Sequence, residues 1–214
     1  LVSARYGFTV VTIEQVEAIR LAGVYDADEY VEQIWDETLI PAVDENAVEL
    51  STVLTEFGVA EGGVASKETL TEVAEEYGRV TDGEAHVYMV AGEGEVVEVD
   101  AESRVGTLRV ALDGYDGPTE VLLFIGPRIP SDESSVRDAV GFINFGDFRD
   151  QTEYGPVAAA INRKINGEIL EPLNEEELLG RTLAFRGAFS IRTFNRVEID
   201  LSSIHITPTY IEVR

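Results

Sequence analysis

HVYMVAGEGEVVEVD, residues 86–100, decides the fold that this sequence predicts. The stretch is rich in valine and aromatic side chains, which is typical of a β-strand. Gly92 and Gly94 interrupt it and indicate a bulge or a sharp coil within the strand. Coiling of this kind fits a strand that turns the corner of a small barrel.

Two further strands follow at short intervals. In RVGTLRVALDG, residues 104–114, Leu108, Val110 and Leu112 alternate onto one face. Residues 113–118, DGYDGP, form a strong turn signal, and residues 119–125 predict the next strand. Together these segments indicate a three-stranded meander.

A helix and two more strands complete the pattern. Pro156 suits a first helical turn, so we expect this helix to begin at about residue 155 or 156. Residues 183–189 and 204–213 predict a fourth and a last strand, and residues 197–201 extend one of these two.

Three meandering strands, a helix and two strands are the order of an OB-fold, a small and partly open five-stranded barrel. The sequence therefore predicts an α+β protein with a helical N-terminal part packed on a five-stranded OB-like β-barrel. A β-sandwich of similar strand count is the alternative. We expect a mostly helical region over residues 1–83 and the barrel, with inserted helices, over residues 84–214.

The N-terminal region opens with GFTVVTI, residues 7–13, which predicts a short strand-like segment. Asp26 then predicts a helix start, because Glu29 follows three residues later as in a capping box. An apolar stripe continues to Leu39, and Pro41 should kink or end the helix near that residue.

Two shorter helices are expected before the barrel. Residues 50–57 predict the first of them. Ser66 caps the second and Gly78 stops it.

The charge balance limits the choice of partners. The chain carries 41 acidic and 16 basic residues, for a formal net charge of -25. Polyphosphates and anionic membrane surfaces would be repelled by that field, so nucleic-acid binding is disfavoured.

Cysteine content and hydropathy limit the compartment. The sequence has no cysteine, hence no disulfide framework and no thiolate metal site. No apolar run approaches the ~20 residues needed to span a bilayer. The chain begins at Leu1 without an initiator methionine, so we expect a signal peptide or membrane anchor to precede it.

The densest mixture of aromatic, amide and charged residues lies at GPRIPSDESSVRDAVGFINFGDFRDQTEY, residues 126–154. Such a stretch is either an internally hydrogen-bonded structural knot or one wall of a binding site. If it is a site, its polar side chains, together with an arginine from the preceding strand-rich segment, are the candidate ligand contacts: Arg104, Arg137, Asp138, Asn144, Asp147, Gln151 and Tyr154.

Each candidate has a chemical reason. Arginine grips carboxylates with two prongs, so Arg104 and Arg137 could hold an acidic ligand, or else pair with a nearby aspartate. Asn144 and Gln151 could contact sugar hydroxyls, or else satisfy the backbone of an irregular turn. Tyr154 could stack on a sugar ring, or else be a half-buried core aromatic.

Catalytic and metal chemistry has little support. The only histidines, His86 and His205, fall on strands without a nucleophile motif, and a structural role is expected for both. We expect no catalytic residue, no cofactor and no dedicated metal site. Calcium at the acidic positions Asp113 and Asp116, or Asp147, Asp150 and Glu153, is possible, but helix capping explains the latter group as simply.

Several short segments, in this order and spacing, resemble an uncharacterised bacterial family, the domain of unknown function 2291, whose members are predicted periplasmic lipoproteins. The segments are Tyr30-Val-Glu-Gln-Ile-Trp35 with Pro41, Gly92-Glu-Gly-Glu-Val96, Ser103-Arg-Val-Gly-Thr107, Gly114-Tyr-Asp-Gly117, Ile125-Gly-Pro127, Arg137-Asp138, Phe142-Ile-Asn-Phe145, Asp147-Phe148, Gln151 and Gly187-Ala-Phe189. The resemblance implies an envelope location, an N-terminal signal or lipid anchor, and association with sugar-uptake transporters of the ATP-binding-cassette type. It implies no activity, and the sequence shows no lipobox cysteine.

Three functions are therefore weighed. The first is a non-enzymatic, envelope-exposed binding or accessory module beside a solute transporter, for a transporter component or a small sugar-like ligand. The second is a carbohydrate-active enzyme, which would need two carboxyl groups ~5–10 Å apart across a cleft. The third, nucleic-acid binding, rests on the barrel alone and is opposed by the charge.

Overall fold

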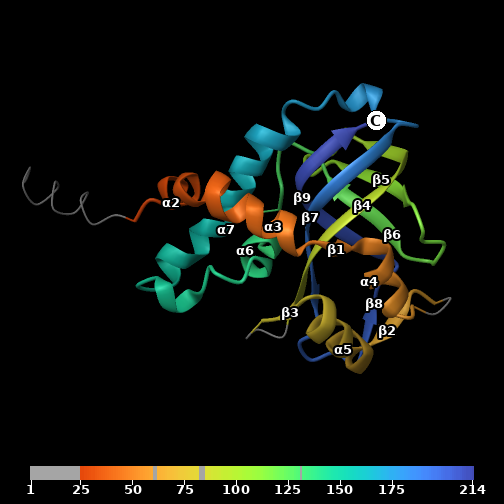
Figure 1. Ribbon diagram of the computed structural model, residues 1–214, viewed down its shortest axis with the longest axis horizontal. Helices are drawn as coiled ribbons and strands as arrows, with labels where there is room; N and C mark the ends of the chain where they lie inside the picture. Colours follow the sequence, from red (N-terminus) through yellow and green to blue (C-terminus); the bar gives the residue numbers. More distant parts are fainter. Residues whose placement is uncertain (1–24, 60–61, 82–84, 131) are drawn as a thin grey trace, which may run out of the picture.

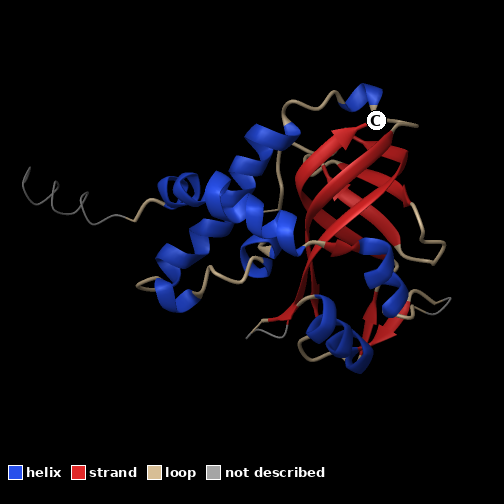
Figure 2. Cartoon of the chain, in the orientation of Figure 1, coloured by secondary structure: helices blue, strands red, loops and turns tan. Residues whose placement is uncertain are grey.

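The computed structural model describes residues 25–59, 62–81, 85–130 and 132–214. The strand expected at residues 7–13 lies outside the described residues. A β-barrel and a group of helices stand side by side, and the barrel strands are strongly tilted across one another (Figures 1 and 2).

Five strands close the barrel: β4 (Ala85–Asp100), β5 (Thr107–Leu112), β6 (Glu120–Phe124), β9 (Ser203–Val213) and β7 (Thr182–Arg192). They are hydrogen-bonded in that order, and β7 pairs back onto β4 to complete the ring. All neighbours are antiparallel except β6 and β9. The predicted α+β class and OB-like barrel are confirmed, and the alternative of a β-sandwich is wrong because one sheet closes on itself.

The two halves of strand β4 pair with different strands. Residues 85–95 pair with β7, and residues 94–100 pair with β5. Gly94 stands where the two pairings meet, and a Cβ there would collide with the carbonyl oxygen of Ala111. Only glycine allows this close approach. The irregularity in pairing falls at Val97, between Val96 and Glu98, rather than at the glycines.

Short strands extend the barrel. β1 (Val48–Glu49) and β3 (Arg79–Val80) both pair with the first half of β4. β2 (Val64–Ser66) pairs with β8 (Glu198–Asp200) in a separate two-stranded sheet. The expectation that residues 197–201 extend β7 or β9 is therefore wrong, because β8 finds its partner in the N-terminal region.

The first helical segment is longer than predicted. Asp26 caps α2 (Ala27–Ile34), as expected, by accepting hydrogen bonds from the backbone N–H groups of Asp28 and Glu29. A π-helical turn, η1 (Trp35–Leu39), leads directly into α3 (Ile40–Asn46). Pro41 neither ends nor interrupts the segment, because the change of hydrogen-bond register places it in a first turn, where a missing N–H costs little.

Two short helices cover one end of the barrel. They are α4 (Leu50–Glu56) and α5 (Lys67–Tyr77), and Ser66 and Gly78 bound α5 as predicted. Buried side chains from both helices join the barrel interior in one hydrophobic core, in which Phe57 and Tyr88 meet edge to face.

The remaining helices lie between β6 and β7 along the chain. They are α6 (Ser135–Ala139), the 3-10 turn η2 (Phe145–Asp147), α7 (Gln151–Ile165), the π-helical turn η3 (Asn166–Leu170) and the 3-10 turn η4 (Glu175–Glu177). Helix α7 begins at Gln151, not at Gly155 or Pro156, because Asp150 caps it through the N–H of Thr152 at 2.8 Å.

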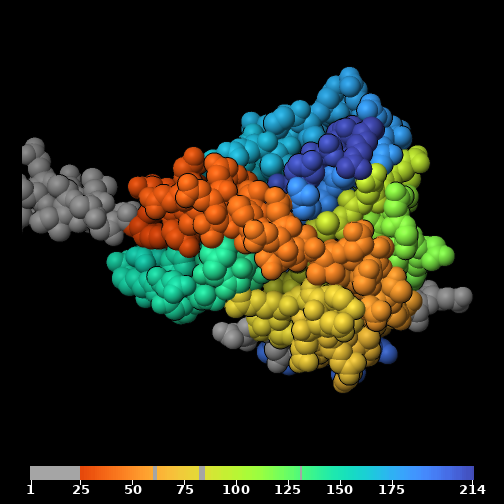
Figure 3. All heavy atoms as spheres, in the orientation of Figure 1, coloured from red at the N-terminus to blue at the C-terminus, as the bar shows by residue number. Residues whose placement is uncertain are grey.

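Helices α2, η1 and α3 pack against α6 and α7, with side chains of β4 and β7 beneath them, and form a second hydrophobic core. In Figure 3 the orange surface of α2, η1 and α3 adjoins the teal surface of η2 and α7. The N-terminal helices are thus shared between the barrel end and the second core. The proposed boundary between residues 83 and 84 stays a prediction.

Candidate functional site

A cavity of about 640 Å³ opens between β3, the start of β4, α6, η2 and the start of α7. Its lining combines charged, amide, aromatic and small side chains: Arg79, Val80, Thr81, Ala85, Arg137, Asp138, Ile143, Asn144, Phe145, Gly146, Gln151 and Tyr154. It is therefore formed largely by the stretch from residue 126 to residue 154.

Arg137, Asp138 and Tyr154 form a hydrogen-bonded cluster in the cavity wall. The Arg137 guanidinium lies over the Tyr154 ring, with Cζ 4.0 Å from the centroid, and its Nη2 lies 2.8 Å from Asp138 Oδ1. The Tyr154 hydroxyl donates to the same oxygen at 3.2 Å, and Ser134 Oγ donates to Oδ2 at 2.6 Å. Because both charged side chains are mostly buried, this cluster fixes the orientation of the guanidinium.

The turn at η2 supplies the next part of the wall. The backbone N–H of Asn144 donates to Asp147 Oδ2 at 3.2 Å, and the N–H of Asp147 returns a bond to the Asn144 carbonyl at 3.0 Å. These bonds hold the turn closed while the Asn144 side chain faces the cavity. Phe145, at the tip of the turn, is 53% exposed and rests edge-on against Tyr154.

The structure brings together five of the seven predicted site residues, namely Arg137, Asp138, Asn144, Gln151 and Tyr154. Asp147 is adjacent to the cavity but does not line it, because its carboxylate is turned back onto the Asn144 backbone. Arg104 lies in the exposed loop between β4 and β5, on the barrel rather than among the residues of the cavity.

Sequence reasoning missed Arg79. Pairing of β3 with β4 places it opposite Val87, and its Nη2 reaches Asn144 Oδ1 at 3.4 Å. The two residues are 65 positions apart, so no local pattern could have joined them. The only feature of the sequence near Arg79 was the predicted helix end at Gly78, which indicates that the chain changes direction there.

Burial and the charged side chains of the cavity shift the pKa of Tyr154. Burial raises the pKa of its hydroxyl, and the Asp138 carboxylate raises it further, while the Arg137 and Arg79 charges oppose the rise. The phenol therefore stays protonated at neutral pH and serves as a hydrogen-bond donor to Asp138.

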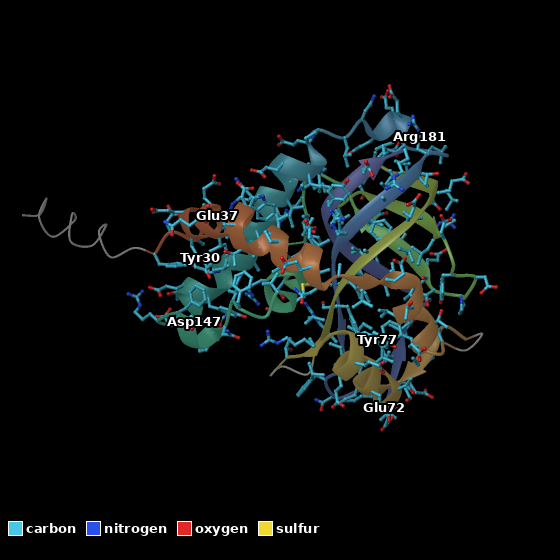
Figure 4. All side chains as sticks on the ribbon, in the orientation of Figure 1. Tyr30, Glu37, Glu72, Tyr77, Asp147 and Arg181 are labelled. Atoms are coloured by element: carbon cyan, nitrogen blue, oxygen red, sulfur yellow. The ribbon has the colours of Figure 1, made fainter. Side chains whose placement is uncertain are left out.

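Behind the cavity, the same stretch is a structural knot. Phe148 meets Tyr25, Tyr30 and Tyr154 edge to face, with ring centroids 5.5–5.6 Å apart. Figure 4 shows Tyr30 and Asp147 in the helical part, far from Tyr77 at the end of the barrel. Residues 126–154 are thus packed as a structural knot on one side and face the cavity on the other, and their role as a binding site stays a prediction.

The acidic group considered for calcium at Asp147, Asp150 and Glu153 has structural partners. Asp150 caps α7, and this hydrogen bonding lowers the pKa of its carboxyl. Glu153 accepts from the Arg149 N–H at 2.9 Å. Within the described residues no group of three or more acidic or histidine side chains could hold a metal ion.

A second cavity, of about 570 Å³, lies where β7, β8 and β9 meet residues 130 and 132–133. His205 lines it and stacks on Phe124, and burial lowers the pKa of the imidazole. Each carboxylate that lines this second cavity already has a partner within the protein. Asp132 pairs with Arg192, Glu133 accepts from the Ser135 N–H, and Asp200 accepts from the Ser202 N–H.

Comparison with known proteins fits this architecture. An OB-fold protein from Thermotoga maritima superposes with a TM-score of 0.65 over 89% of this chain and 99% of that one, at 18% sequence identity. At this identity the likeness shows the fold alone. No curated protein matches the chain.

None of the helices within the described residues is long and apolar enough to cross a membrane. The family model "Predicted periplasmic lipoprotein (DUF2291)" matches residues 1–212, which confirms the resemblance carried by the short segments. The chain therefore belongs to the DUF2291 family of predicted periplasmic lipoproteins.

Proposed function

We propose that this protein is a periplasmic binding module that holds a small, hydroxyl-rich solute in the cavity beside Tyr154 without transforming it. The observation that carries the proposal is the fixed Arg137–Asp138–Tyr154 cluster facing the same space as Asn144 and Gln151. Oriented donors and acceptors around a solute-sized space are typical of small-molecule sites.

Size and chemistry both support a small solute. At about 640 Å³ the cavity falls within the usual range of roughly 300–1,000 Å³ for ligand sites. The amides of Asn144 and Gln151 can each donate and accept, which suits hydroxyl groups. Phe145 adds an exposed aromatic face beside them.

The carboxylate of Asp138 is already bonded to neighbouring side chains, which favours binding over catalysis. Asp138 is the one acidic residue among the described residues that line this cavity, and Arg137, Tyr154 and Ser134 all engage it. Sugar hydrolysis would require a second carboxyl group across the cleft. The family resemblance to partners of sugar-uptake transporters leads us to propose a sugar-like ligand and an accessory role beside such a transporter.

A thermal-shift screen of the whole chain against sugars, sugar acids and divalent cations tests the proposal. A ligand present at 100 times its dissociation constant should add ~2.7 kcal/mol to the free energy of unfolding. Gln151→Ala should abolish the shift and leave the unliganded melting temperature unchanged, because Gln151 is exposed and lines the cavity.

Gln33→Ala is the matched control, since Gln33 is also exposed on a helix but lies outside the cavity. Equal loss of the shift in both variants, or a solute-induced shift that survives Gln151→Ala together with Asn144→Ala, would place binding elsewhere and contradict the proposal.

A further inference from the structure

Arg79 stands out among the cationic residues of the cavity. Its guanidinium lies between Asn144, whose Oδ1 is 3.4 Å from Nη2, and the backbone of Gly141. A Cβ on Gly141 would stand 2.6 Å from Nη1, so the absence of a side chain at that position leaves room for the guanidinium. Arg79 is thus directed into the cavity by its surroundings.

The charge of Arg79 is not balanced within the described part of the chain. Arg137 has Asp138 at 2.8 Å, whereas no described carboxylate lies at ion-pair distance from Arg79. The described lining therefore holds two guanidinium groups and one carboxylate. Asp82 and Glu84, which follow closely in the sequence, lie outside the described residues.

Among the described arginines without a carboxylate at ion-pair distance, such as Arg104, Arg79 is the one that lines this cavity. The chain has 41 acidic residues for 16 basic ones, so a carboxylate of its own could readily have been placed beside Arg79. A planar guanidinium left without such a partner in a cavity suits a carboxylate brought by a ligand, which it can bind with two parallel hydrogen bonds.

Resting on the proposed function, we infer that the ligand is a sugar acid or a similar small hydroxylated monocarboxylate, and that Arg79 binds its carboxylate. Asn144 and Gln151 then contact hydroxyl groups, and the exposed ring of Phe145 covers one apolar face of the solute. A phosphate ester is less well matched, because it carries nearly two charges for one unbalanced guanidinium.

Titration calorimetry of the wild-type chain with matched pairs of solutes is the first test. Glucuronate and glucose, and galacturonate and galactose, differ only in a carboxylate against a hydroxymethyl group. We expect the acid of at least one pair to bind roughly tenfold or more tightly than its neutral partner, which is the usual worth of one charge-assisted interaction.

Variants then locate the effect. Arg79→Ala should weaken binding of the acid by roughly tenfold or more and weaken binding of its neutral partner much less, through the lost contact with Asn144. Arg79→Lys should recover part of the loss, since it restores the charge but not the planar fork. Arg104→Ala removes the same charge from the exposed β4–β5 loop and should change neither affinity.

The outcomes separate the two proposals. If neutral sugars bind as tightly as their acids, or if Arg79→Ala weakens both members of a pair alike, the sugar-acid inference is wrong and the binding module stands. An equal effect of Arg104→Ala would also overturn the inference, because the long-range field would then explain the preference. If no solute of either kind binds the wild-type chain, both proposals fail together.

Discussion

The guanidinium of Arg137 lies over the ring of Tyr154, with Cζ 4.0 Å from the ring centroid, and both residues bond to the same carboxylate oxygen of Asp138. The arrangement links α6 to the first turn of α7. A cation over an aromatic ring contributes about 0.5–2 kcal/mol, depending on its exposure to water. The site is therefore stabilised by the same contacts that orient it.

Asp138 should matter more to stability than the Tyr154 hydroxyl. Tyr154→Phe removes one hydrogen bond and should cost about 0.5–1.5 kcal/mol in the free energy of unfolding. Asp138→Ala leaves a mostly buried guanidinium without its partner and should cost more, about 2–4 kcal/mol. Urea denaturation of the two variants measures the difference, and equal costs would show that the ion pair adds nothing.

Asn144 and Asp147 should separate binding from folding. Asp147→Ala removes the carboxylate that accepts from the Asn144 N–H, so it should cost about 1 kcal/mol without loss of solute affinity. Asn144→Ala removes an amide from the cavity and also the side-chain half of the capping box with Asp147, so it should lower solute affinity in addition to costing about 1 kcal/mol in the free energy of unfolding. Calorimetry and thermal melts of both variants test this, and the reverse pattern would refute the assignment.

The predicted site residues that line the cavity are close together along the chain. Arg137, Asp138, Asn144, Gln151 and Tyr154 fall within 18 positions, on α6, η2 and the start of α7, so the packing of neighbouring helices brings them near one another. Arg79 lies beside them only because β3 pairs with β4, whereas Arg104 lies apart from them in the loop between β4 and β5. Long-range strand pairing is not encoded in any local pattern.

The fold shows the same difference between features that local sequence patterns predict and features that they do not. Alternation and glycine-rich turns predicted the strand order, and side-chain caps predicted the starts of α2 and α5. The predictions from the two prolines are wrong because other features set the helix boundaries. The π turn before Pro41 lets the helical segment continue, and the Asp150 cap starts α7 ahead of Pro156.

Glu168 should anchor the helical layer through Trp35. The indole Nε1 donates to Glu168 Oε2 at 2.8 Å, and Trp35 is 2% exposed. Glu168→Ala leaves this N–H without its acceptor and should cost about 1–3 kcal/mol, whereas Glu168→Gln keeps an acceptor and should cost less than about 1 kcal/mol. Trp35 is the single tryptophan, so its fluorescence follows the unfolding directly. Similar costs for both variants would contradict the role of the hydrogen bond.

Gly94 should not tolerate a side chain. A methyl group at this position meets the Ala111 carbonyl, a backbone atom that cannot move without disturbing the pairing of β4 with β5. Gly94→Ala should therefore lower the free energy of unfolding by about 1–3 kcal/mol or more. Gly146→Ala is the control, because a Cβ added there would have no neighbouring atom within 4 Å, and it should be nearly neutral. A neutral Gly94→Ala would show that the barrel is less tightly coiled than described.

Alkaline pH should destabilise the fold through Tyr25. Burial, with smaller contributions from Tyr30 and Glu153, raises the pKa of this tyrosine to about 12 from 10.0. The unfolded chain ionises first as pH rises, so the contribution of Tyr25 is full below pH 10 and is lost between pH 10 and about 12. Tyr25→Phe should flatten part of this decline in urea denaturation. An unchanged pH profile in the variant would show that Tyr25 ionises equally in both states.

Strand β4 presents alternate side chains to two different cores. Val87 belongs to the helical core and Tyr88 to the barrel core, and Ala188 and Phe189 repeat the division on β7. Neither core can open without exposing the back of a strand that the other requires, so the two should melt as a single cooperative unit. A solute that tightens the helical wall would consequently slow amide hydrogen exchange deep inside the barrel, and occupancy of the cavity could be detected from residues that never touch the ligand.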